Sequence, residues 1–138
     1  MPNQPAPLSR PVASIVSPEA CRRGAETLVA ICARLQSNER AYIVADATTR
    51  DVADYVVAAA RAISSQVEFD VIEPLVIHGA TPPQNVGRGM QRGDVIFGLT
   101  RMSLAHTQER QQACLRGARY LSLPDYSLEL LGGPSLQF

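Results

Sequence analysis

The segment AYIVADATTRD, residues 41–51, decides the fold. Its first five residues form a short and almost continuously apolar run, which is typical of a strand buried on both faces of a parallel sheet. Small polar residues follow, and from Asp51 onward apolar residues return at helical spacing. Strand, short loop and helix in this order predict the first crossover of an α/β domain.

The alternation of helix and strand continues on both sides of this segment. A helix is predicted to begin at Ser17-Pro18, where a hydroxyl at the N-cap precedes a proline in the first turn. Apolar and acidic residues alternate at 67–73, which indicates an edge strand with one exposed face. Two further strands are expected at residues 95–99 and 118–123, and further helices at 51–63, 84–91 and 103–116.

Short connections between these elements imply parallel strands joined by right-handed crossovers. We therefore predict a Rossmann-like α/β three-layer sandwich, with a four-stranded, mainly parallel sheet in the order 2-1-3-4 and helices on both faces. The first and third strands are the most uniformly apolar and belong in the centre. Ligands in such folds bind beyond the carboxyl ends of the strands where the strand order reverses, here between the first and third strands.

The chain of 138 residues is long enough for one domain with a substantial core. Residues 1–17 hold four prolines among small polar residues and are expected to form an arm. The α/β domain is expected over residues 18–126, followed by a tail over residues 127–138. Leucines at the start of this tail predict a docked turn of helix.

Composition excludes several classes of partner. Thirteen basic residues balance thirteen acidic ones without a basic run, so nucleic acid is not an expected partner. No apolar run is long enough to span a membrane and no leader is recognisable, so we expect a cytoplasmic protein that does not enter membranes. Cys21, Cys32 and Cys114 lack CxxC spacing, and the first two are expected to pack in the core.

The sequence offers few groups for catalysis, so we predict no catalytic residue, metal or cofactor. His78 and His106 are the two histidines, and neither lies in a metal-ligand spacing. His106 is expected in the first turn of the helix at 103–116. It lies only three residues from Ser103, which is too close in sequence for a catalytic arrangement of nucleophile, base and orienting group. Glycines at 87 and 89 lie within a helix rather than after a strand, unlike a dinucleotide-binding loop.

Polar residues that follow the strands are therefore candidates for binding a ligand rather than for chemistry. Guanidinium groups just beyond a strand suit a carboxylate, although a solvated surface arginine is the plainer alternative. Thr48 and Asp51 are spaced as in a capping box, and Asp46 is open to either a structural or a binding role. The candidate ligand-binding residues are Asp46, Thr48, Arg50, His78, Arg101, Ser103 and His106.

Several of these loops resemble those of a known family. The segments TTRDVA (48–53), Glu73-Pro74, Pro82-Pro83 and SLAHT (103–107) look like the N-terminal domain of the thermophilic aminopeptidase family, which includes leucyl aminopeptidase and aminopeptidase T. Relatives of that family include dihydroxypyridine ring-cleaving dioxygenases. The resemblance covers roughly residues 22–126. It implies a Rossmann-like domain that borders a peptide-binding cleft and helps in dimer contacts.

The metal ligands of that family belong to its larger C-terminal part, which we expect this chain to lack. The resemblance and the scarcity of reactive groups favour a non-catalytic peptide-binding accessory protein, which presents a precursor peptide to modifying enzymes in peptide natural-product biosynthesis. One alternative is a detached subunit or fragment of a metal-dependent aminopeptidase or ring-cleaving dioxygenase. A third is a structural or small-molecule-sensing homodimer built through the apolar tail.

Overall fold

The computed structural model describes residues 16–78 and 80–137. It contains one sheet of four strands in the order β2-β1-β3-β4, and every pairing is parallel, which confirms the predicted topology. The predicted arm lies outside the described residues except for Val16 and Ser17. The strands are β1 (Ala41–Asp46), β2 (Val67–Ile72), β3 (Val95–Gly98) and β4 (Arg119–Ser122).

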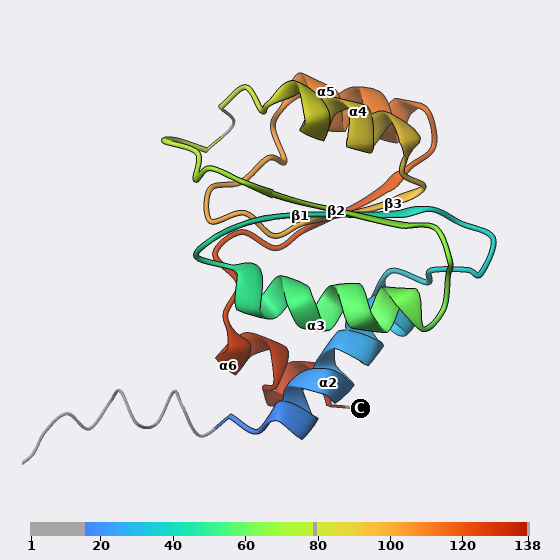
Figure 1. Ribbon diagram of the computed structural model, residues 1–138, viewed down its shortest axis with the longest axis vertical. Coiled ribbons are helices and arrows are strands. Elements are labelled where there is room, and N and C mark those ends of the chain that lie inside the picture. The colour runs from blue at the N-terminus through green and yellow to red at the C-terminus, as the bar shows by residue number, and fades with distance from the viewer. Residues whose placement is uncertain (1–15, 79, 138) are drawn as a thin grey trace, which may run out of the picture.

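Helices cover both faces of the sheet, as Figure 1 shows. Two helices lie on one side, and three helices and two short irregular turns belong to the other. The first group is α4 (Gln84–Arg92) and α5 (Gln108–Leu115). The second group is α2 (Pro18–Thr27), the π-helical turn η1 (Leu28–Cys32), α3 (Arg50–Arg61), α6 (Leu128–Leu131) and the 3-10 turn η2 (Pro134–Leu136).

The core is built around β1, every residue of which is buried. Successive side chains of a strand point to opposite faces, so β1 serves two apolar clusters. Ile43 packs in the cluster that contains residues of α2 and α3, whereas Tyr42 and Val44 pack in the cluster that contains residues of α4 and α5. Within the described residues, no helix is long and apolar enough to cross a bilayer.

Ser17 caps the first helix as predicted, because its Oγ accepts a hydrogen bond from Ala20 N at 3.0 Å. The prediction for Cys32 is wrong: Cys21 is buried, but Cys32 is exposed. The helix ends in a π-helical turn, in which Ala33 N donates to Leu28 O, five residues back. The wider turn changes the helical phase, so an eleven-residue spacing no longer returns to the same side.

The helix expected at 103–116 begins only at Gln108. Thr107 is its N-cap, and Thr107 Oγ1 accepts a hydrogen bond from Arg110 N at 3.2 Å. His106 therefore lies before the helix, and its predicted place in the first helical turn is wrong. Ser103 Oγ instead accepts from Ala105 N at 3.0 Å, which stabilises a turn that precedes the helix.

The C-terminal segment packs on the same chain. Leu131 and Leu136 are buried in the cluster that contains α2 and α3. Gly24 allows this packing, since a Cβ at that position would lie 1.7 Å from the carbonyl oxygen of Leu131. The side chains of the predicted apolar tail are therefore used largely within the chain, although Leu130 is half exposed.

Replacing Gly24 by alanine is expected to lower the free energy of unfolding by about 1–3 kcal/mol, because the added methyl group displaces α6. Gly87→Ala is the matched control, since a Cβ there meets only Glu109 Cγ, at 3.5 Å. Alanine is the better helix former, so this control is expected to gain up to about 1 kcal/mol. Urea unfolding followed by circular dichroism measures both; an unchanged stability of the Gly24 variant would contradict the packing of α6.

Arg119 joins the start of β4 to the loop between η1 and β1. Its guanidinium donates to the carbonyl oxygens of Ala33 and Arg34 at 3.1 Å, and to both carboxylate oxygens of Glu39 at 2.8 and 3.0 Å. The hydrogen bond from Arg119 lowers the pKa of Glu39 below its ordinary value of 4.5. This pair is one of the links that tie the start of the edge strand β4 to the segment before the central strand β1.

The Glu39 pair is expected to make stability depend on pH. A folded-state pKa below the unfolded value means that the contribution is present above pH 4.5 and is lost as the pH falls through the folded value. Glu39→Gln is therefore expected to cost roughly 0.5–1 kcal/mol at pH 7 and progressively less towards pH 3. Urea unfolding over that range, with the exposed Glu26→Gln as control, measures the difference; a cost that does not change with pH would contradict the assignment.

Candidate functional site

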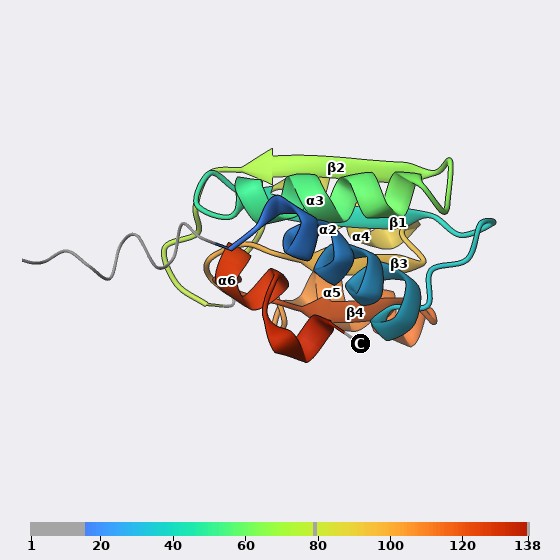
Figure 2. The same ribbon diagram turned by 90° about the horizontal axis from the view of Figure 1, so that it is seen from below.

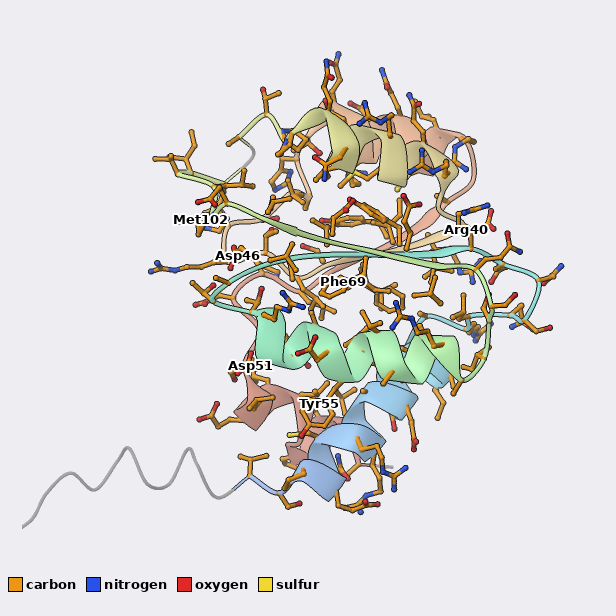
Figure 3. The ribbon with its side chains drawn as sticks, viewed as in Figure 1. Arg40, Asp46, Asp51, Tyr55, Phe69 and Met102 are labelled. Atoms are coloured by element: carbon orange, nitrogen blue, oxygen red, sulfur yellow. The ribbon has the colours of Figure 1, made fainter. Side chains whose placement is uncertain are left out.

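The loops after β1 and β3 meet through the buried carboxylate of Asp46. Its Oδ1 accepts hydrogen bonds from Thr48 N at 2.9 Å and Thr48 Oγ1 at 2.5 Å, and its Oδ2 accepts from Arg101 N at 2.9 Å. Figure 3 shows Asp46 beside Met102 at one end of the sheet, with Arg40 at the opposite end. The loop after β1 and the loop after β3 are therefore joined at the position where the sequence predicts ligand binding.

The predicted capping box is wrong. Thr48 Oγ1 donates to Asp46, and the N-cap position of α3 is Thr49, which makes no side-chain cap bond. Thr49 Oγ1 instead accepts from Asp46 N at 3.2 Å. Asp51 Oδ1 accepts from the neighbouring Val52 N at 2.7 Å rather than from Thr48. Both threonines are used to fix the turn around Asp46.

The loop after β2 reaches the same place through a histidine. His78 Nδ1 accepts a hydrogen bond from Ser103 N at 2.7 Å. An imidazole nitrogen that accepts a bond carries no proton, so the neutral ring holds its proton on Nε2. His78 is exposed, and Ser103 is half-buried. The loops that follow β1, β2 and β3 are thus linked by hydrogen bonds at the carboxyl ends of these strands.

Five of the seven candidate residues are therefore brought together: Asp46, Thr48, His78, Arg101 and Ser103. Both oxygens of Asp46 are occupied within the protein, which gives this residue the structural role that the sequence left open. Arg101 takes part through its backbone N–H, and its side chain is exposed. A ligand at this edge would meet Arg101 and His78 rather than the Asp46 carboxylate. Their binding roles stay predictions.

The other two candidates lie differently. His106 is exposed in the turn before α5. Arg50 is directed to the edge strand: its Cζ lies 5.7 Å from the centroid of the Phe69 ring, and its Nε lies 3.7 Å from Asp54 Oδ1. Figure 3 places Phe69 between the sheet and α3. Arg50 therefore borders β2, a position that its place in the sequence did not predict.

The edge of β2 is open for backbone pairing. Ala41 N donates to Gln66 O at 2.9 Å, which directs the backbone groups of even-numbered residues towards β1. Those of Val67, Phe69 and Val71 consequently point to the free edge, because successive residues alternate sides. Figure 2 shows β2 as the outermost strand, with no element of the described chain beside it.

Three large apolar side chains are exposed near the end of this strand and in the loop that follows it. Val71 is 39% exposed, and Val76 and Ile77, in the loop that follows, are 85% and 62% exposed. Sequence reasoning missed these residues because it searched the loops after the strands for polar candidates such as His78, and not for apolar ones. The signal was present in three successive large apolar residues, 75–77, which an exposed loop does not need. We call Val71, Val76 and Ile77 the apolar rim of β2.

The two faces of β2 differ in chemistry. On the α4 side, Glu68 forms a salt bridge with Arg92, and Asp70 Oδ2 accepts a hydrogen bond from Tyr42 Oη at 2.8 Å. On the α3 side, Val67 and Phe69 pack against the core cluster. The strand thus presents acidic groups on one face and apolar groups on the other.

Two hollows of about 450 Å³ lie elsewhere on the surface. One, of about 460 Å³, is lined by α2, η1 and the C-terminal segment, including Ile31 and Leu136. The other, of about 450 Å³, lies between Thr81 and the exposed sides of α4 and α5. Among residues 16–78 and 80–137, no three His, Cys, Asp or Glu side chains gather closely enough to hold a metal ion.

Comparisons with known proteins relate this fold to that of an enzyme of known structure. No protein-family model matches the sequence, and no curated protein matches it significantly. The fold is similar to that of 2,5-dihydroxypyridine dioxygenase from Pseudomonas putida KT2440, with a TM-score of 0.57 and 14% sequence identity. The likeness covers 72% of this chain and 32% of the dioxygenase, so it spans about a third of that enzyme. It bears out the predicted resemblance at the level of the fold, and the aminopeptidase part stays a prediction.

Asp46→Asn is expected to lower the free energy of unfolding by about 1–3 kcal/mol. An amide has one acceptor oxygen, so its NH₂ must face either Thr48 or Arg101, both of which donate. Urea unfolding measures the loss, and Asp125→Asn, which alters an exposed carboxylate in the turn after β4, is expected to change stability by less than about 0.5 kcal/mol. A similar small change at both positions would contradict the joining role of Asp46.

Proposed function

We propose that this domain is a non-catalytic binding protein that takes up an extended peptide along the free edge of β2. The observation that carries the proposal is the edge itself: six residues long, open along its outer side and followed by the apolar rim. An added strand bonds the main chain of such an edge, and side-chain contacts then give specificity. Val67, Phe69 and Val71 supply the free backbone groups.

The opposite edge of the sheet is a poorer site. β4 has four residues, and its first residue, Arg119, is held by Glu39 and by two carbonyl oxygens. Within the two edge strands themselves, Val71 of β2 is an exposed large apolar residue, whereas Tyr120 and Leu121 of β4 are half-buried. Length and apolar surface therefore both favour β2.

The non-catalytic part of the proposal is supported by how the polar groups are used. At the carboxyl ends of the strands, Asp46 is bound by Thr48 and Arg101, and His78 by Ser103, all within the chain. A domain that holds a peptide by its main chain leaves side chains of the peptide accessible. It is therefore suited to present a precursor peptide to modifying enzymes, the role that the sequence predicts.

A second candidate is a subunit of a ring-cleaving dioxygenase, favoured by the fold likeness to about a third of 2,5-dihydroxypyridine dioxygenase. In that case the apolar rim of β2 would contact the remainder of the enzyme. The chain alone and the chain mixed with the product of an adjacent reading frame would be assayed for loss of 2,5-dihydroxypyridine. Turnover only on mixing would favour this candidate over peptide binding.

Val71→Pro is expected to weaken peptide binding at least about tenfold, because it removes an N–H that faces the free edge. The N–H of Val71 does not bond β1, so the sheet is expected to remain intact. Val71→Thr keeps the N–H and is the matched control. Peptides selected from a displayed random dodecapeptide library on the full chain would be measured by fluorescence polarisation against both variants.

Circular dichroism would confirm that the proline variant keeps its fold. Selected peptides that bind the proline variant as tightly as the unchanged protein would place the site elsewhere. A selection that enriches no peptide at all would contradict the proposed function.

A further inference from the structure

Asp70 is a half-buried carboxylate on β2, the strand with the open edge. Its Oδ2 accepts from the hydroxyl of Tyr42, which is fully buried. Burial raises the pKa of Tyr42 well above its ordinary value, so this hydroxyl is a neutral donor. The bond fixes the carboxylate in place without neutralising its charge.

The basic residue on the neighbouring helix is already engaged. Arg92 donates to both carboxylate oxygens of Glu68 through Nε and a terminal nitrogen. Within the part of the chain that the structure describes, no basic nitrogen lies within ion-pair distance of Asp70. Glu68 is thus paired with Arg92, whereas the carboxylate of Asp70 forms no salt bridge among the described residues.

The position of Asp70 directs this charge at an added strand. Asp70 lies between Phe69 and Val71, whose backbone groups face the free edge. In an added strand, the residue directly opposite Asp70 has its Cβ about 5 Å away on the same face. Its neighbours in the added strand point to the other face, beside Phe69 and Val71.

These charges argue against a second copy of the chain as the occupant. A symmetric antiparallel pairing of two β2 strands centred on Phe69 would place Glu68 opposite Asp70 of the other copy, and one centred on Asp70 would place the two aspartates opposite each other. Like charges directly opposite each other are destabilising. A strand that carries a basic residue is the complementary partner.

Resting on the proposed function, we infer that the peptide bound along β2 carries a lysine or arginine opposite Asp70, with apolar residues on either side of it. The basic side chain meets the carboxylate that Tyr42 positions. The flanking apolar side chains meet Phe69 and Val71 on the α3 face, beside the guanidinium of Arg50. The strand thus selects alternating apolar and basic residues.

The test uses three fluorescein-labelled nonapeptides, Gly-Ser-Val-Xaa-Val-Xaa-Val-Ser-Gly, in which Xaa is lysine, glutamine or glutamate. Fluorescence polarisation with the full chain is expected to show binding of the lysine peptide about two- to fivefold tighter than the glutamine peptide, and weaker binding of the glutamate peptide. Asp70→Asn is expected to remove this order, because Tyr42 can still donate to the amide while the charge is gone. Asp125→Asn, an exposed carboxylate in the turn after β4 at the opposite edge of the sheet, is the control that keeps the order.

The outcomes separate this inference from the proposed function. Equal binding of all three peptides would overturn the selection for a basic residue and leave peptide binding along β2 standing. An order that survives in Asp70→Asn would place the recognising charge elsewhere and also overturn it. Failure of the lysine peptide to bind would overturn the inference, whereas the library selection with Val71→Pro decides the proposed function. A preference that weakens in 1 M salt is expected for a partly exposed ion pair.

Discussion

The complete enclosure of β1 is the constraint on which the rest of the structure depends. All six of its residues are buried, its neighbours are β2 and β3, and its two faces feed separate apolar clusters. β1 is paired with β2 on one side and with β3 on the other. Because β2 is the first strand in this order, its outer side has no neighbouring strand in the sheet. The same enclosure places the end of β1, Asp46, out of solvent, where a carboxylate must be hydrogen-bonded. The loops after β1 and β3 supply those bonds.

Much of the architecture could be predicted because it rests on burial. Continuous apolar runs identified β1 and β3 as central, and the alternation of apolar and acidic residues identified β2 as an edge strand. A glycine at position 98 of β3 leaves room for Tyr120, whose Oη lies where a Cβ of that residue would be. The π-helical turn left no compositional signal, so the exposure of Cys32 could not be foreseen. The start of α5 was ambiguous because Ser103 and Thr107 are both capable N-caps, and only Thr107 is used.

The site was predictable in position but less so in use. Parallel topology brings the loops after β1, β2 and β3 to one edge whatever their side chains do, and contacts such as His78 with Ser103 follow from it. The direction of a long side chain is a matter of rotamer and local packing, which sequence spacing does not report. Arg50 is the clear case, since it follows β1 and yet lies over Phe69 on β2. Asp46 differs from the prediction in another way. It was a candidate for binding a ligand, but both of its carboxylate oxygens already accept hydrogen bonds from the protein.

If the domain binds a partner, these observations favour the free edge of β2 over the carboxyl ends of the strands as the place of binding. At the carboxyl ends of the strands, the carboxylate oxygens of Asp46 already accept hydrogen bonds from Thr48 and Arg101. At β2, by contrast, backbone groups, the apolar rim and the carboxylate of Asp70 all remain available to one added strand. Unpaired main-chain groups on an edge strand are a liability for aggregation unless the edge is short, charged or covered. Like charges opposite each other would oppose pairing between copies of the chain. Under the proposed function, the same acidic residues of β2 would admit a basic peptide.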